Sequence, residues 1–495
     1  MKCGFDSNKY YKLQSKTIKE RFKLFDKLYL EVGGKLFDDY HAARVLSGFK
    51  ADSKINMFKE LKDDLEIIIC ISANAIEKNK VRAEYDITYD LEVIRLINNF
   101  RNLGFLVNSV VITLYNHQSS TDKFIKRLEK ENIKTYIHTY TKGYPTDVDT
   151  IVSEEGYGAN PYIETSKRLV IVTAPGPGSG KLATCLSQLY HERKRCVNAG
   201  YAKYETFPVW NLPLKHPVNM AYEAATADLK DVNMIDSFHL KEYGIVSTSY
   251  NRDLEIFPVV KEILYKITGE NIYLSPTDMG VNKIGFAIKD NDKIEDDAKK
   301  EIVRRYLNEY MNYKLGLAEE DVPNRIKVLM NELKIDDTYL KVVNAAREKA
   351  DKVNSEVVAI ELKNGKIITG KETKLLSATS SAIINTIKYL TKIPDEIDLL
   401  SPSILEPILK NRIKDLDNSD SPLKLREVMI ALSICSVTNP SVEKALNTLS
   451  SLEGCEVHST YIMLGSSDYK MLKNLKMNVT CSPYFYLERK KEELV

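Results

Sequence analysis

The amino-acid sequence predicts an α/β fold whose main domain is built on a mostly parallel sheet. Short apolar runs alternate with amphipathic helical patterns through the first half of the chain, which is typical of βαβ units. Runs such as EIIIC are apolar without interruption, and this suits strands that are covered on both faces. At residues 168–195 one apolar run leads through a glycine-rich loop into a helical pattern.

The expected elements of the first half follow in order along the chain. Apolar runs predict strands at residues 65–73, 108–115, 133–140 and 168–174. Apolar residues at helical spacing predict helices at residues 90–103 and 121–131. The segment 141–166 has no clear periodicity, and it is either a binding loop or a surface excursion.

The sequence pattern changes near residue 290. Three successive helical patterns with acidic starts predict a small helical subdomain. Two alternating apolar segments then flank Asn364-Gly365, which is a strong signal for a β-hairpin. Two more helical patterns and a strand–helix–strand tail predict a C-terminal α/β or α+β subdomain. The predicted domains are therefore residues 1–290, 291–355 and 356–495.

Composition and charge restrict the class of protein. The 495 residues include 71 basic and 69 acidic side chains, so the net charge of +2 gives no case for nucleic acid as a partner. No apolar run approaches the roughly 18 residues of a membrane span, so we expect no membrane partner. The polar start MKCGFDSNKYYK lacks an apolar signal region, and we expect a cytoplasmic protein. The sequence leaves a homo-oligomer open.

The cysteines and histidines argue against a metal site. The seven cysteines are odd in number, none forms a C-x-x-C pair, and most stand in apolar runs, where cysteine packs as a small hydrophobic residue. The seven histidines are scattered. We therefore expect neither a zinc site nor a disulfide.

The sharpest candidate for chemistry is the loop PGPGSGK at residues 175–181, which follows the apolar run RLVIVTA and precedes an amphipathic helix. Strand, loop and helix in this order are the context of a phosphate-binding loop. Gly176, Gly178 and Gly180 let the backbone turn so that several N–H groups point at one anion, and the helix adds the positive end of its dipole. Lys181 can reach the outer phosphates as a point charge.

The loop departs from the common G-x-x-x-x-G-K-[ST] pattern at two positions. Pro175 stands where a glycine is expected, and Leu182 stands where a serine or threonine would bind magnesium. Ser179 or Thr184 can supply the missing hydroxyl. The alternative is a tight turn between strand and helix, in which Lys181 is merely solvated.

Further polar residues follow in the segment 208–239, which begins near the single tryptophan. His216, Asp228 and Asp231 are candidates to position an acceptor or a Mg²⁺ ion, because imidazoles act as bases and carboxylates as oxygen ligands. The alternatives are an ordinary loop histidine and, for the aspartates, helix caps or turn residues.

Two more segments combine turn residues with polar groups. Gly33-Gly34, followed by Lys35, predicts either a plain hairpin turn or a second phosphate-binding loop. The segment 275–288 holds Ser-Pro and Met-Gly junctions, which mark loops. Asp278 and Asn282 in this segment either face a pocket or are ordinary loop residues.

The chain resembles the bacterial family of domains of unknown function number 1846. The resemblance lies in four strings, FDSNKYYKLQSKTI, EVGGKLFDDYHAARVLSGF, TAPGPGSGKLATCLSQ and LPLKHPVNMAYEAATADL, and it extends over essentially the whole chain. It implies an α/β portion, a small helical subdomain and a C-terminal α/β subdomain. It implies no activity and no site residues.

The chemistry of the loop therefore carries the functional prediction. We expect an enzyme that binds a nucleotide or another phosphorylated metabolite at residues 176–181, with ATP or another nucleotide and Mg²⁺ as cofactor. Lys181 would neutralise charge during phosphoryl transfer or NTP-driven activation of a small molecule. The alternative from another class is a binding or regulatory protein that holds a phosphorylated ligand without turnover. A third hypothesis is an isomerase or phosphatase that acts on a phosphorylated substrate without NTP.

Overall fold

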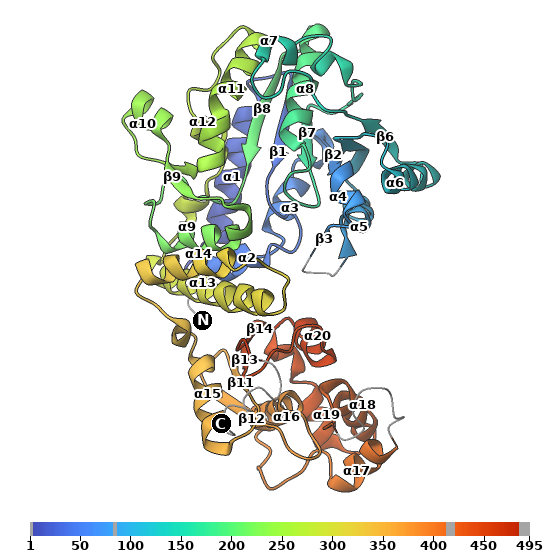
Figure 1. Ribbon diagram of the computed structural model, residues 1–495, viewed down its shortest axis with the longest axis vertical. Coiled ribbons are helices and arrows are strands. Elements are labelled where there is room, and N and C mark those ends of the chain that lie inside the picture. The colour runs from blue at the N-terminus through green and yellow to red at the C-terminus, as the bar shows by residue number, and fades with distance from the viewer. Residues whose placement is uncertain (1–2, 83–86, 412–420, 485–495) are drawn as a thin grey trace. The chain divides into compact units, whose positions relative to one another are not determined.

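The structure is a computed structural model that describes residues 3–82, 87–411 and 421–484. The chain forms two compact units, residues 2–298 and residues 299–495. Figure 1 shows a parallel sheet between helices in the first unit, and a smaller sheet with its own helices in the second. The α/β class that the sequence predicts is confirmed.

Six parallel strands form the sheet of the first unit, in the order β6-β5-β2-β7-β1-β8. They are β1 Lys27–Val32, β2 Leu65–Ser72, β5 Leu106–Thr113, β6 Lys134–Ile137, β7 Leu169–Thr173 and β8 Ala199–Tyr204. Every residue of β2 and β7 is buried, as their uninterrupted apolar sequences predict. These two strands lie side by side in the middle of the sheet (Figure 1).

Helices cover both faces of this sheet, because alternate side chains of a strand point to opposite faces. Leu169 and Ile171 of β7 join the core under α1 Ser7–Phe22, α3 Ser53–Lys59, α5 Tyr89–Asn102 and α6 Ser119–Lys130. Val170 and Val172 join the core under α7 Val148–Ile151, α8 Lys181–Lys194 and α11 Asn251–Thr268. Each face therefore has its own hydrophobic core.

Shorter elements complete the first unit. Two small antiparallel pairs join β3 to β4 and β9 to β10. The strands are β3 Val81–Arg82, β4 Ile87–Thr88, β9 Asn233–Ile235 and β10 Thr248–Tyr250. The helices and 3-10 turns are α2 Tyr40–Val45, α4 Ala73–Glu77, α9 Pro217–Ala225, α10 Ser237–Tyr243, α12 Pro276–Met279, η1 Lys62–Asp64, η2 Tyr157–Ala159, η3 Ala227–Leu229 and η4 Ile284–Ala287.

Three helices occupy the region in which the sequence predicts a helical subdomain. They are α13 Asn291–Lys314, α14 Asp321–Glu332 and α15 Lys341–Val353, with the turn η5 Asp337–Tyr339. The two compact units divide after residue 298, which lies inside α13. The predicted domain limits at 290 and 355 stay a prediction. Across the described part of the chain, no helix is long and apolar enough to cross a membrane.

The second unit holds a mixed four-stranded sheet in the order β12-β11-β13-β14. β11 Val357–Glu361 and β12 Ile367–Lys371 form the hairpin that the sequence predicts, and Gly365 has a φ of +81° in its turn. β13 Glu456–Ser459 pairs antiparallel with β11 and parallel with β14 Asn478–Cys481. The helices of this unit include α16 Ala378–Thr391, α17 Pro402–Lys410, α18 Leu425–Ser436, α19 Pro440–Leu446 and α20 Ser467–Asn474, with η6 Leu449–Leu452.

The structure corrects one prediction and adds the strands β1 and β8 to the six-stranded sheet. Gly33-Gly34 does not close a hairpin, because β1 pairs in parallel with β7 on one side and β8 on the other. The strand β1, KLYLEV, has a weak sequence signal because Lys27 and Glu31 interrupt its apolar pattern. The strand β8, AGYAKY, has a weak signal because glycine, alanine and lysine are uncommon in strands.

Candidate functional site

The glycine-rich loop lies at the carboxyl edge of the central sheet. It leaves β7 after Thr173 and enters α8 at Lys181, so the predicted strand–turn–helix arrangement is present. After β2, the next strand of this sheet along the chain is β5, which lies on the side of β2 away from β7. After β7, the next strand is β8, which lies in the opposite direction, beyond β1. Ligands of open α/β sheets bind where the strand order reverses in this way. The fold thus places the loop at the position that such ligands prefer.

Three glycines shape the loop, for two different reasons. Gly178 and Gly180 have φ angles of +71° and +81°, a left-handed region in which side chains are strained. A Cβ atom on Gly180 would also lie 2.7 Å from Thr113 Cγ2. A Cβ atom on Gly176 would overlap the Tyr89 ring and hydroxyl. The loop backbone therefore runs directly against the end of β5 and the start of α5.

The first turn of α8 begins at a glycine. Its N-cap residue is Gly180, and among the residues that the structure describes no side-chain oxygen caps the first backbone N–H groups of the helix. These N–H groups and the helix dipole give this end of the helix a positive electrostatic character. Pro177 and Gly178 are exposed, so the tip of the loop is open to solvent.

Lys181 adds a full positive charge at the first position of α8. Within the described ranges it forms no ion pair with a carboxylate.

Two buried cysteines lie near Lys181. Burial raises the pKa of Cys70 to about 12 and that of Cys185 well above its usual value, although the nearby Lys181 ammonium acts in the opposite direction. Both thiols therefore stay protonated at neutral pH, and neither is an activated nucleophile.

The two hydroxyls that the sequence suggests as magnesium ligands both hydrogen-bond to the loop itself. Ser179 Oγ donates to the Gly176 carbonyl at 2.8 Å, and Thr184 Oγ1 donates to the Gly180 carbonyl at 3.0 Å. Both side chains are buried. Among the described residues, no group of three or more His, Cys, Asp or Glu side chains is arranged to hold a metal ion. The loop therefore offers a ligand its backbone N–H groups and Lys181.

A second set of charged residues lies at the carboxyl ends of β1 and β8. Lys203 Nζ contacts the Asp253 carboxylate oxygens at 2.7 and 2.8 Å and Glu205 Oε2 at 3.1 Å. Burial raises the pKa of Glu205 despite the adjacent Lys203 ammonium. Gly33 makes room for this cluster, because a Cβ atom there would overlap the Glu205 side chain. No sequence pattern identifies the cluster, because Gly33 and Asp253 are far from Lys203 and Glu205 in the chain.

The two candidate aspartates have different surroundings. Asp231 is buried, its Oδ2 lies 3.3 Å from Arg252 Nη2, and the charges of Asp253 and Lys203 act on it. Burial raises the pKa of Asp231 above its usual range. Asp228 lies on the exposed turn η3. The described contacts join neither aspartate to Lys181, and their catalytic role stays a prediction.

His216 is the N-cap of α9. Its Nδ1 atom accepts a hydrogen bond from the Val218 N–H at 3.2 Å, and its Nε2 atom lies 3.0 Å from Asn291 Oδ1. The helix begins after this residue, at Pro217. These contacts give His216 a structural task in starting a helix, whereas the alternative from the sequence is an ordinary loop histidine. Its catalytic role stays a prediction.

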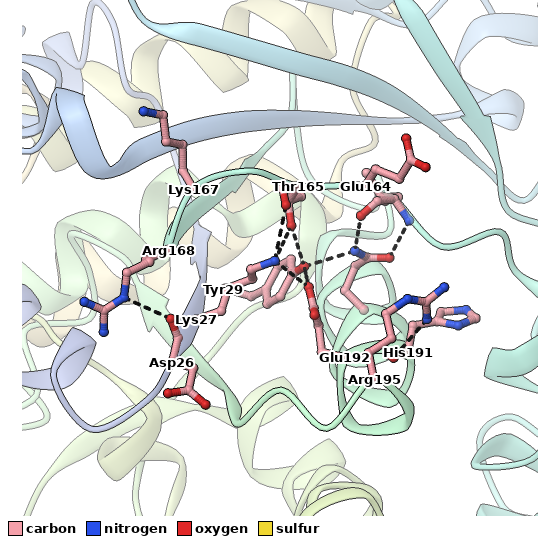
Figure 2. Close-up of polar contacts among 12 residues, drawn as sticks. Asp26, Lys27, Tyr29, Glu164, Thr165, Lys167, Arg168, His191, Glu192 and Arg195 are labelled. Carbon is pink, nitrogen blue, oxygen red and sulfur yellow. Dashed lines mark hydrogen bonds and ion pairs between the residues drawn. The ribbon is translucent and has the colours of Figure 1, made fainter.

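A buried polar network lies at the opposite, amino edge of the sheet (Figure 2). Glu192 in the last turn of α8 accepts a hydrogen bond from Lys27 Nζ at 2.9 Å, and the same Nζ donates to Thr165 Oγ1 at 2.7 Å. Gln188 bonds to both the N–H and the carbonyl of Ile163. The chain that leads into β7 is therefore packed against α8, so this part of the segment 141–166 is a fixed connection.

The fold and the loop define an α/β protein with a glycine-rich loop at the carboxyl edge of its parallel sheet. Two family models match the chain, Domain of unknown function DUF1846, N-terminal, at residues 3–334, and Domain of unknown function DUF1846, C-terminal, at residues 338–490. The chain belongs to the DUF1846 family, as the resemblance predicts.

Relatives with similar sequences match along almost their whole length. The chain is 54% identical over 494 residues to the UPF0371 protein of Clostridium botulinum strain Alaska E43, and this covers 98% of each chain. It is 52% identical over 494 residues to the UPF0371 protein of Clostridium tetani strain Massachusetts, again covering 98% of each. The names of these relatives state no activity, so the function has to be argued from the site.

Proposed function

We propose that the protein binds a nucleotide or another phosphorylated metabolite through the loop at residues 176–181. The observation that carries this proposal is the uncapped N-terminus of α8 at the reversal of strand order, with Lys181 as its first residue. Backbone N–H groups, a helix dipole and an ammonium group at one position suit a phosphate. The exposed tip of the loop lets a ligand approach from solvent.

Two functions are compatible with such binding. The first is an enzyme that uses ATP or another nucleotide with Mg²⁺ for phosphoryl transfer or for activation of a small molecule, with Lys181 neutralising charge on the transferring group. The second is a binding or regulatory protein that holds the phosphorylated ligand without turnover. Leu182 in place of a hydroxyl residue, and the internal hydrogen bonds of Ser179 and Thr184, favour the second.

A thermal-shift panel of nucleotides and sugar phosphates, with and without Mg²⁺, tests the ligand class. A ligand at 100 times its Kd adds about 2.7 kcal/mol to the free energy of unfolding, which raises Tm measurably. Turnover of a stabilising nucleotide would assign the enzyme. Stabilisation without turnover would assign the binding protein.

The Lys181→Ala variant tests the loop itself. Loss of a charge-assisted contact costs about 1.5–3 kcal/mol, so we expect affinity for the best panel ligand to fall roughly 10- to 150-fold. The Tm without ligand should barely change, because surface substitutions have small effects. Lys194→Ala, at the other end of the same helix, is the matched control and should bind like the wild type. Equal affinities of wild type and Lys181→Ala would overturn the proposal.

A further inference from the structure

A second candidate site is a surface hollow of about 370 Å³ in the first unit. It lies beside the outer edge of β8, where Gly280 pairs with Lys203. Its volume falls within the range of small-molecule pockets. Asp278 and Asn282, which the sequence predicts either to face a pocket or to be ordinary loop residues, both line it. No residue of the glycine-rich loop lines it, so it is a separate place on the molecule.

Aromatic rings form part of the wall of this hollow. Trp210, Tyr243 and Tyr273 line it, and Trp210 is the single tryptophan of the chain. Trp210 Nε1 donates to the Asn282 carbonyl at 3.0 Å, which fixes the orientation of the indole. Such rings offer flat apolar surface to a planar ligand.

Two cations, Arg21 and Lys283, line the same hollow. Arg21 donates from Nη2 to the backbone carbonyl of Asp278 at 2.8 Å and lies 5.2 Å from the centre of the Tyr273 ring. Lys283 Nζ lies 5.8 Å from the centre of the Trp210 ring. In the described part of the chain neither cation forms an ion pair. Ring faces and a carbonyl stabilise these charges only in part, which leaves them available to an anion.

The Asp278 carboxylate in the wall is already used by its own turn. Its Oδ2 atom accepts hydrogen bonds from the N–H groups of Leu274 and Ser275 at 3.0 and 3.1 Å and from the Tyr243 hydroxyl at 3.0 Å. The hydrogen bond from the Ser275 N–H belongs to the capping box of α12, in which Ser275 is the N-cap. His239 also lines the hollow, and its Nδ1 atom lies 2.9 Å from Ser275 Oγ. With a neutral His239, the described lining residues hold two cations and one carboxylate, which leaves one excess positive charge in the hollow.

We propose that this hollow binds a small aromatic carboxylate. The planar ring of the ligand packs against Trp210 and Tyr243, and its carboxylate lies between Lys283 and Arg21. A single negative charge balances the excess positive charge, whereas a phosphate dianion would place a second charge beside Asp278. The proposal concerns a different site from the glycine-rich loop and does not depend on it.

Benzoate is the probe for this proposal, and the fluorescence of Trp210 is the readout because the indole forms part of the wall. In the full-length protein we expect a saturable change in fluorescence as benzoate is added. Benzamide has the ring without the charge, and acetate has the charge without the ring. Each should bind at least about tenfold more weakly than benzoate, a difference of about 1.4 kcal/mol.

Two variants with matched controls test the residues. Lys283→Gln should weaken benzoate binding by about tenfold or more, because it removes a charge-assisted contact. Arg21→Gln is the second variant and should likewise weaken benzoate binding. Thermal melts check that both variants fold. Lys261→Gln, in a separate hollow lined by Phe257 and Tyr265, is the control and should keep wild-type affinity. Lys181→Ala should also keep wild-type benzoate affinity, so this proposal and the loop proposal fail separately.

Three outcomes would overturn the proposal. The first is a wild-type protein whose fluorescence shows no saturable response to benzoate. The second is equal benzoate affinity of the wild type and of folded Lys283→Gln and Arg21→Gln. The third is tighter binding of phenyl phosphate than of benzoate, which would contradict the match between one excess positive charge and a carboxylate.

Discussion

Single residues of the glycine-rich loop meet two separate physical requirements. Gly178 has a φ of +71° with open space where a side chain would lie, whereas Gly180 has a φ of +81° and faces Thr113. The first position needs glycine for its backbone angle alone. The second needs glycine for its backbone angle and for its close contact with β5. Thr113 also donates a hydrogen bond to the Ser179 carbonyl at 3.0 Å, which ties the end of β5 to the loop.

Alanine at each position separates these two requirements. Gly178→Ala should lower the free energy of unfolding by about 1–2 kcal/mol, the cost of a left-handed backbone for a residue with a side chain. Gly180→Ala should lower it by about 2–5 kcal/mol, because overpacking against Thr113 adds about 1–3 kcal/mol. Urea titration measures both losses. Equal losses would contradict the packing argument for Gly180.

At the scale of elements, α8 connects the two edges of the sheet. Its first turn presents Lys181 at the carboxyl edge, and its last turn carries Glu192 in the network at the amino edge (Figure 2). The Glu192 side chain is 1% exposed, and Lys27 Nζ lies 2.9 Å from its Oε1 atom. A buried ion pair that loses one partner leaves an uncompensated charge in the core. The network therefore fixes the helix that carries the loop.

Lys27→Met tests this role of the network. We expect the free energy of unfolding to fall by about 3–5 kcal/mol, because Glu192 keeps a buried negative charge without its cation. Lys134→Met is the matched control, since its ion pair with Glu164 is exposed and screened by water, and its urea midpoint should match that of the wild type. A wild-type midpoint for Lys27→Met would show that Glu192 does not need its partner.

At the scale of the whole molecule, each compact unit contains a buried histidine that stays neutral in the folded state. Burial lowers the pKa of His138 in the first unit from 6.5 to about 4, and that of His458 in the second from 6.5 to about 3. Below pH 6.5 the unfolded chain therefore binds protons that the folded units exclude. The contribution of the neutral imidazoles to the free energy of unfolding is fully present above pH 6.5. It is lost as the pH falls toward about 4 for His138 and about 3 for His458.

Unfolding titrations at several pH values measure this loss. For the first unit, Trp210 fluorescence should report a free energy of unfolding that falls below pH 6.5, by at most about 1.4 kcal/mol per pH unit for one histidine. His138→Gln should flatten this slope, and His458→Gln should flatten the slope seen by circular dichroism. The exposed residue His117 provides the control, because His117→Gln should keep the wild-type slope. Unchanged slopes in both variants would contradict the pKa argument.

The elements that the sequence predicts well are those that depend on neighbouring residues. The apolar run that forms β2 and the helical spacing of α5 place both elements within one or two residues of their bounds. The hairpin at Asn364-Gly365 follows from the turn residues themselves. The helix cap at His216 is not predicted, since histidine is not among the residues that the N-cap position prefers.

The α/β class, four of the six strands of the first sheet and the strand–loop–helix context of Lys181 can be predicted from sequence, because they depend on local periodicity and turn chemistry. The folded structure was needed to show that β1 lies between β7 and β8, that the loop stands at the reversal of strand order, and that Arg21 and Lys283 line one hollow. These arrangements join residues more than a hundred positions apart. Their partners are selected by packing of the folded chain, for which no short stretch of sequence carries a signal.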